Sequence, residues 1–189
     1  MSENVIINAM RQRVSQANLT GKGPTKAQWQ QVLEAASRAA DHGGLKPWRY
    51  VIFEDDARSA LGECFWLHAK AEVPELTEDK KPNFINKAYR APSVLMVYCQ
   101  YQDNPKAPEI EQIMAVSAAT QQVLLGLDAL NYGAIWRSGP VAHSDLTKQQ
   151  LGLTLQDQIV GFLYVGQTTE PRPEPKAVDL SDNLTWYGQ

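Results

Sequence analysis

"PEIEQIMAVSAATQQVLLGLDALN", residues 108–131, carries small or apolar side chains on nearly every side of the helix that it predicts. A helix that is apolar all round lies inside a core or in a subunit interface. The preceding segment "RAPSVLMVYCQ", residues 90–100, is an apolar run without alternation, which is typical of a strand buried on both faces. The middle of the chain therefore supplies a buried strand and, after it, a buried helix.

Further strands and helices alternate on both sides of this centre. Strands are predicted at 48–53, 132–138 and 158–166, and helices at 55–70 and 143–152. This order, which contains no repeats, indicates an α/β or α+β domain with a mixed sheet.

Two segments lack a regular pattern. Residues 72–87 are polar and contain proline, so we expect an irregular excursion there. Residues 167–189 are proline-rich and polar and are predicted to form an extended tail. Because this tail ends in an aromatic pair, Trp186 and Tyr187, we expect it to dock on a partner chain.

The first clear helix is predicted to begin at Thr25, because Gln28 completes a capping box. Its apolar stripe comprises Trp29, Val32, Leu33, Ala36 and Ala40, and the left-handed glycines Gly43 and Gly44 are expected to end it. Helical spacing then places Arg38 and His42 together on the opposite face. That pair is either a solvated polar face or an anion or cofactor site reached from outside the subunit.

Composition excludes several classes of protein. The chain has 189 residues and a net charge of −3, so it has no basic field for nucleic acid. No apolar window is long enough to span a membrane, and no signal peptide is evident. The cysteines Cys64 and Cys99 form no CxxC motif, so we expect free thiols and a cytoplasmic protein.

The residues that usually carry metal or nucleophilic chemistry are not arranged for it. His42, His68 and His143 share no ligand spacing, so no metal site is expected. Neither cysteine has an obvious base beside it, and no serine stands in a nucleophile motif. No Gly-x-Gly-x-x-Gly or Walker loop is present either.

Two short motifs suit a ligand. In "MRQRVSQ", residues 10–16, Arg13 and Ser15 flank Val14, and a guanidinium and a hydroxyl could there share one phosphate. In "AIWRSG", Trp136, Arg137 and Ser138 stand where a strand runs into a loop, a usual place for a ligand. An exposed strand-end arginine is the equally simple alternative for the second motif.

Taken in order, these motifs resemble the nitroreductase family of FMN-dependent oxidoreductases. The resemblance rests on the R-x-S motif, "DHGGLKPWRY" (41–50), "RAPSVLMVYC" (90–99), the long helix with "GAIWRSG", and "GFLYVG" (161–166). It runs from about residue 11 to 166, so residues 1–166 are expected to form the FMN-binding domain and 167–189 a C-terminal extension. The implied fold is α+β, with a mixed central sheet flanked by helices.

The resemblance also implies an obligate homodimer with two FMN sites at its interface. By similarity, Arg13, Val14 and Ser15 would bind the FMN phosphate and ribityl end, and Trp136, Arg137 and Ser138 of the same chain would line the isoalloxazine. Arg38 and His42 would reach the flavin held mainly by the other subunit. Many relatives have a second basic residue where this chain has Ala17, so weaker phosphate binding is expected.

The implied reaction takes electrons from NADH or NADPH through flavin N5 to a nitroaromatic, a quinone or a similar acceptor, in a ping-pong sequence without a catalytic side chain. Two alternatives stay open at this point. One is a family offshoot with another flavin reaction, and the other is a flavin-binding or sensing module with little turnover.

Overall fold

The computed structural model describes residues 4–188. Its sheet has the strand order β1-β2-β4-β3, and every neighbouring pair is antiparallel. The strands are β1 Trp48–Glu54, β2 Ser93–Cys99, β3 Gly133–Arg137 and β4 Gln158–Gly166. The helices are α1 Val5–Gln12, α2 Lys26–Ala36, α3 Arg58–Glu72, α4 Lys81–Ile85, α5 Glu109–Ala129 and α6 Asp145–Gln150. Short 3-10 helices lie at His42–Gly44, Asp55–Ala57, Glu78–Lys80, Asn86–Tyr89 and Pro140–His143.

The α+β class is confirmed, but the sheet is antiparallel where a mixed one was expected. Strands β2 and β3 do run in the same direction and are joined by α5, as the alternation of elements predicts. The later strand β4 lies between them, antiparallel to both, so no two parallel strands are hydrogen-bonded neighbours.

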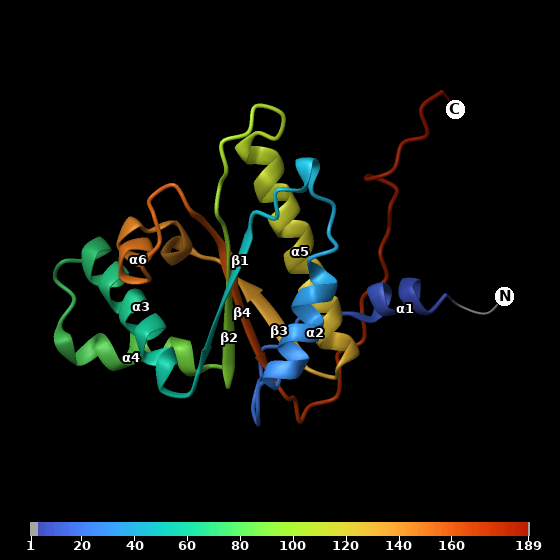
Figure 1. Cartoon of the computed structure of the whole chain (residues 1–189). Coiled ribbons are helices and arrows are strands. Elements are labelled where there is room, and N and C mark those ends of the chain that lie inside the picture. The colour runs from blue at the N-terminus through green and yellow to red at the C-terminus, as the bar shows by residue number, and fades with distance from the viewer. Residues whose placement is uncertain (1–3, 189) are drawn as a thin grey trace.

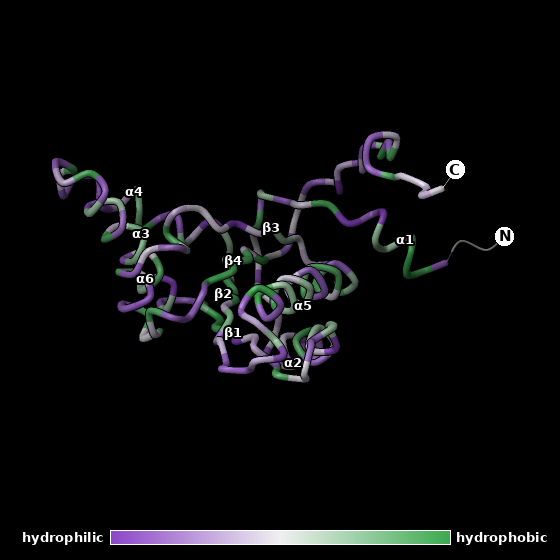
Figure 2. The backbone as a smooth tube through the Cα atoms, turned by 90° about the horizontal axis from the view of Figure 1, so that it is seen from above, coloured by the Kyte–Doolittle hydropathy of each residue, from purple (hydrophilic) through white to green (hydrophobic). Residues whose placement is uncertain are grey.

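Helices cover both faces of the sheet (Figure 1). On one face α2 and α5 pack on a cluster that includes Trp29, Val97 and Val123, and on the other face α3 covers a cluster that includes Leu61 and Phe162. Seen from above, the sheet lies between these two layers, and α1 and the tail project from the α5 side (Figure 2). Strand β2 is buried on both faces, as its unbroken apolar run predicts.

Helix α5 confirms the long central helix. Its inner side is fully buried, as Val116 and Leu127 show, whereas Ile110 and Met114 near its start are 58% and 60% exposed. Exposed apolar side chains of this size on a core helix suit a surface that a second subunit covers. No helix within residues 4–188 combines the length and apolarity needed to cross a membrane.

The prediction of an irregular excursion at residues 72–87 is wrong for its second half, which forms α4 and two 3-10 turns. The segment packs on α3: a Cβ on Gly62 would lie 2.9 Å from the Ile85 backbone, and the Trp66 and Phe84 rings are 5.8 Å apart. The Lys81–Glu63 ion pair, at 3.0 Å, adds a polar contact. Phe84 and Ile85 contact α3, although the polar residues around them hide any helical spacing.

The predicted helix of residues 25–42 begins as expected and ends early. Thr25 and Gln28 form the capping box, but α2 stops at Ala36. After Ser37 the N–H groups of Arg38 and Ala39 donate to carbonyls three residues back, at 3.1 and 3.0 Å, so the α-helical pattern gives way to tighter turns. Ala39 is consequently buried in place of Ala40, and the argument that placed Arg38 and His42 on one helical face is wrong.

Candidate functional site

The R-x-S motif leaves the end of α1 and runs to the edge of the sheet. Arg13 caps α1 through its N–H to the Ala9 carbonyl, at 3.1 Å, and the chain is extended from there. Three residues on, the Gln16 N–H donates to the Ala134 carbonyl of β3 at 3.0 Å. This bond anchors the residue after the motif to β3, the strand that ends at Trp136 and Arg137.

A pocket of about 570 Å³ contains the whole R-x-S motif. Arg13, Val14 and Ser15 line it together with Arg11 and with Lys176 from the C-terminal tail. Ile7, Met10, Pro175 and Val178 complete its walls. Cationic and hydroxyl groups that converge on one hollow suit a phosphate, which accepts several charge-assisted hydrogen bonds.

The tail reaches this pocket because its first part is fastened to its own chain. Gln167 exchanges backbone hydrogen bonds of 2.8 and 2.9 Å with Thr20, and the Asn18 amide donates to both Glu170 carboxylate oxygens. Arg172 then forms an ion pair with Asp128 of α5 at 2.8 Å. The first part of the tail therefore packs on its own chain. Docking on a partner chain stays a prediction for the outer part, where Trp186 is 64% exposed.

Lys176 is the binding candidate that sequence reasoning missed. The structure brings it to a motif at the opposite end of the chain, and no local pattern signals such a contact. It adds a cation to the pocket that Arg11 and Arg13 line.

Trp136 and Arg137 lie on opposite faces of β3. The Trp136 side chain packs on the α5 face, where its indole Nε1–H donates to the Val160 carbonyl at 3.2 Å. Arg137 and Ser138 line a second pocket, of about 540 Å³, between α3 and the end of β3. The sequence predicts that Trp136, Arg137 and Ser138 all line the isoalloxazine ring. Because the Trp136 side chain points to the other face of the sheet, only its backbone could do so on the side of Arg137 and Ser138.

The second pocket is largely aromatic and apolar, and three cations are among its lining residues. Phe65, Phe84, Phe162 and Tyr164 are among its walls, and Lys87 and Arg90 join Arg137 in its lining. Burial raises the pKa of Tyr164 to about 12, an effect that Arg90 and Arg137 oppose. Lys87 ends the segment that was predicted to be irregular, and Arg90 begins the run that was predicted as a buried strand. Sequence reasoning singled out neither residue for a site.

Arg38 and His42 line neither pocket. Arg38 is exposed just after α2, and His42 Nδ1 lies 2.5 Å from Glu111 Oε2 at the start of α5. A single chain therefore does not bring these two residues to the others. Their assignment to a flavin held by a second subunit stays a prediction.

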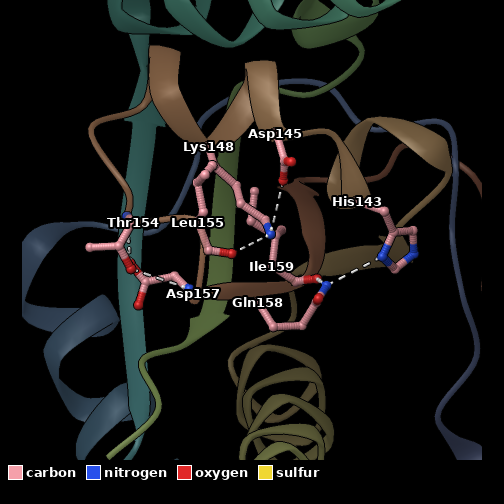
Figure 3. Close-up of polar contacts among 8 residues, drawn as sticks. All are labelled: His143, Asp145, Lys148, Thr154, Leu155, Asp157, Gln158 and Ile159. Atoms are coloured by element: carbon pink, nitrogen blue, oxygen red, sulfur yellow. Dashed lines mark hydrogen bonds and ion pairs between the residues drawn. The ribbon is translucent and has the colours of Figure 1, made fainter.

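A polar cluster beside α6 orders the entry into β4 (Figure 3). Lys148, only 7% exposed, donates to the Leu155 carbonyl at 2.9 Å, and Asp157 accepts from the Thr154 N–H at 2.8 Å. The Gln158 amide contacts His143 Nδ1 at 3.2 Å. These bonds satisfy the groups within the loop, so the cluster is structural and positions the strand that carries Phe162 and Tyr164. Across the described residues, no group of three or more His, Cys, Asp or Glu side chains could hold a metal.

Both cysteines are buried thiols without the features of a nucleophile. Burial is the main cause that raises the pKa of Cys64 to about 11 and that of Cys99 to about 12. Because both pKa values are raised, the reactive thiolate is scarce at about pH 8.

We expect neither thiol to react with Ellman's reagent in the native protein at that pH. Both thiols should react once guanidinium chloride has unfolded the chain. A native thiol that reacts fast would contradict this assignment.

Comparison with known proteins agrees with this geometry. The sequence profile of the Nitroreductase family matches residues 10–167. The protein named Putative NAD(P)H nitroreductase YdjA of Escherichia coli K12 is 32% identical over 155 residues, which are 82% of this chain and 83% of YdjA. A nitroreductase-like family protein from Bacillus cereus superposes with a TM-score of 0.82 at 21% identity, covering 100% of this chain and 99% of that one.

A second solved structure is the FMN-dependent nitroreductase NfnB of Mycobacterium smegmatis in complex with NADPH. It superposes with a TM-score of 0.74 at 14% identity, covering 96% of this chain and 97% of NfnB. The profile match and the identity to YdjA together show that this chain belongs to the nitroreductase family.

Proposed function

We propose that the protein is a cytoplasmic, homodimeric, FMN-dependent oxidoreductase that passes electrons from NADH or NADPH to a nitroaromatic, a quinone or a similar acceptor. The observation that carries the proposal is the pocket where Arg13, Ser15 and Lys176 meet, because its donors match a phosphate dianion. The relationship to YdjA and the likeness to NfnB, described as FMN-dependent and in complex with NADPH, support the same cofactors.

Each of the two pockets would hold one part of FMN. Arg13, Ser15 and Lys176 would hold the phosphate, and Val14 would contact the ribityl chain. Arg137 and Ser138, with the backbone of Trp136, would border the ring beside the aromatic pocket, and Lys87 would add a cation there. Residues 1–166 would thus form the cofactor domain, and the extension 167–189 would supply Lys176 and, through its outer part, a contact with the partner subunit.

Bound FMN would supply hydride acceptance and two-electron transfer, with the balance NAD(P)H + H⁺ + ArNO₂ → NAD(P)⁺ + ArNO + H₂O. The protein contributes binding, orientation and exclusion of water. Apolar walls such as Phe65 and Phe162 would keep water from the ring, and Lys87 and Arg137 would favour negative charge on its pyrimidine edge. No side-chain nucleophile is needed, in keeping with the buried, high-pKa cysteines.

The direct test is reconstitution and turnover. The purified protein should be yellow, or become so with FMN, and should oxidise NADH or NADPH with nitrofurazone as acceptor. A protein that takes up no FMN contradicts the proposal. Bound FMN that dithionite reduces but excess NADH and NADPH do not would instead indicate a flavin-binding module, and turnover confined to one member of a metabolite panel would indicate another flavin reaction.

Subunit sharing predicts complementation between two defective variants. Arg13→Ala and Arg38→Ala homodimers should each bind FMN weakly, since every site then lacks one arginine. In a mixed dimer, one site joins the intact Arg13 of one chain to the partner subunit's Arg38, so half of the FMN sites should recover. Co-expression with two affinity tags, followed by titration of the doubly tagged dimer, measures this.

The control is the unfolding temperature of the Arg38→Ala apoprotein. Because Arg38 is exposed after α2, it should unfold at the wild-type temperature. Recovery of no site in the mixed dimer would refute sharing, and a large loss of apoprotein stability would show that Arg38 acts through folding.

A further inference from the structure

Three cations share the aromatic pocket without an ion pair. Lys87, Arg90 and Arg137 all line it, and within residues 4–188 none of them lies at ion-pairing distance from a carboxylate. By contrast, Arg172 forms an ion pair with Asp128 at 2.8 Å. Lys87 instead places its ammonium 4.2 Å from the centre of the Phe84 ring.

Gathering these cations is unfavourable in the absence of an anion. Burial and, to a smaller extent, the neighbouring charge of Arg90 lower the pKa of Lys87. Arg90 and Arg137 also stand together, because both line the neighbouring hollow as well, and both act on the Tyr164 hydroxyl. An anionic ligand would relieve this repulsion.

The pocket is polarised from one end to the other. Arg90, Arg137 and Tyr164 stand where it meets a neighbouring hollow lined by residues 17–20. Glu72 and His68 stand at a different end, where it meets a hollow lined by His143 and Asp145. Between the ends, the walls are apolar and include Phe65, Phe84 and Phe162. Such a site is complementary to a flat apolar molecule with one anionic end.

We propose that this pocket accepts an aromatic electron acceptor that carries a carboxylate, and that Arg90 recognises the carboxylate. The inference rests on the proposed FMN-dependent function and names its acceptor class. Arg137 belongs to the residues proposed for the flavin, and Lys87 is held over Phe84, which leaves Arg90 as the cation available to substrate. A guanidinium binds a carboxylate through two parallel hydrogen bonds, which a neutral group cannot reproduce.

The test compares two probes of nearly equal shape, 4-nitrobenzoate and its neutral amide, 4-nitrobenzamide. Each is titrated calorimetrically into the oxidised FMN-loaded enzyme without NAD(P)H, so that binding is measured and no turnover occurs. The wild-type enzyme should bind the carboxylate about 10-fold more tightly than the amide. Arg90→Gln should remove this preference while leaving FMN affinity unchanged. Lys106→Gln, the same charge change at an exposed residue outside the pocket, should retain it.

Each other outcome overturns one specific claim. An FMN-loaded enzyme without preference, or an Arg90→Gln variant that keeps the preference, refutes the acceptor class and leaves the flavin proposal intact. If Arg90→Gln weakens FMN binding as strongly as Arg13→Ala does, the cation serves the cofactor and the inference is wrong. A chain that takes up no FMN refutes the proposed function, and the same titration of that chain then decides whether the pocket still prefers the carboxylate.

Discussion

Replacing Arg13 with alanine is expected to raise the dissociation constant for FMN about 10- to 100-fold while leaving that for riboflavin nearly unchanged. The reason is the place of Arg13 in the pocket with Ser15 and Lys176, which offers the donors that a phosphate requires. Riboflavin lacks the phosphate and otherwise matches FMN. Quenching of flavin fluorescence during titration with apoprotein measures both constants.

Lys176→Ala is the companion variant, because Lys176 reaches the same pocket from the far end of the chain. It should weaken FMN binding by a smaller factor, since an ammonium lacks the paired donors of a guanidinium, and should again spare riboflavin. Lys106→Ala, a remote exposed lysine, controls for net charge. Equal losses for FMN and riboflavin would show that Arg13 supports the ring or the fold rather than the phosphate.

The contrast between these two residues shows how far sequence reasoning reaches into the site. Arg13 could be proposed from the sequence because the R-x-S motif forms part of the resemblance to the family, and its role stays a prediction. Lys176 could not, since it reaches Arg13 only through contacts such as Asn18–Glu170 and Arg172–Asp128, which join distant segments. The buried strand β2 and helix α5 were predictable for the opposite reason: their burial is recorded in a continuous run of apolar residues.

The errors have local physical causes. After Ser37 backbone bonds to carbonyls three residues back replace the α-helical ones, although the apolar spacing suggests continuation of the helix. Around Phe84 and Ile85 a short helix is stabilised by packing on α3 rather than by its own sequence, so its pattern is weak. A mixed sheet was expected because the sequence does not show that β4 lies between β2 and β3. Which strands become neighbours depends on the topology of the whole chain.

The largest loss of stability is expected from Gly161→Ala in β4. An added Cβ would lie 2.2 Å from Trp136 Nε1 and 2.9 Å from the Arg137 carbonyl oxygen. The carbonyl belongs to the sheet backbone and cannot rotate away, and moving the indole breaks its hydrogen bond to Val160. Overpacking and the lost bond together should lower the free energy of unfolding by about 2–4 kcal/mol, as measured by urea denaturation of the apoprotein.

Two further variants separate steric clash from a general effect of replacing glycine. Gly152→Ala adds a Cβ in open space and carries only the left-handed backbone penalty of about 1–2 kcal/mol. Trp136→Phe removes the Nε1 atom, so the double variant with Gly161→Ala should lose less stability than the sum of the single variants. Strict additivity would show that the indole does not meet the new methyl group.

Gly161→Ala should also weaken FMN binding. Arg137 and Ser138 follow Trp136 directly, so displacement of this strand end would move two residues of the proposed cofactor site.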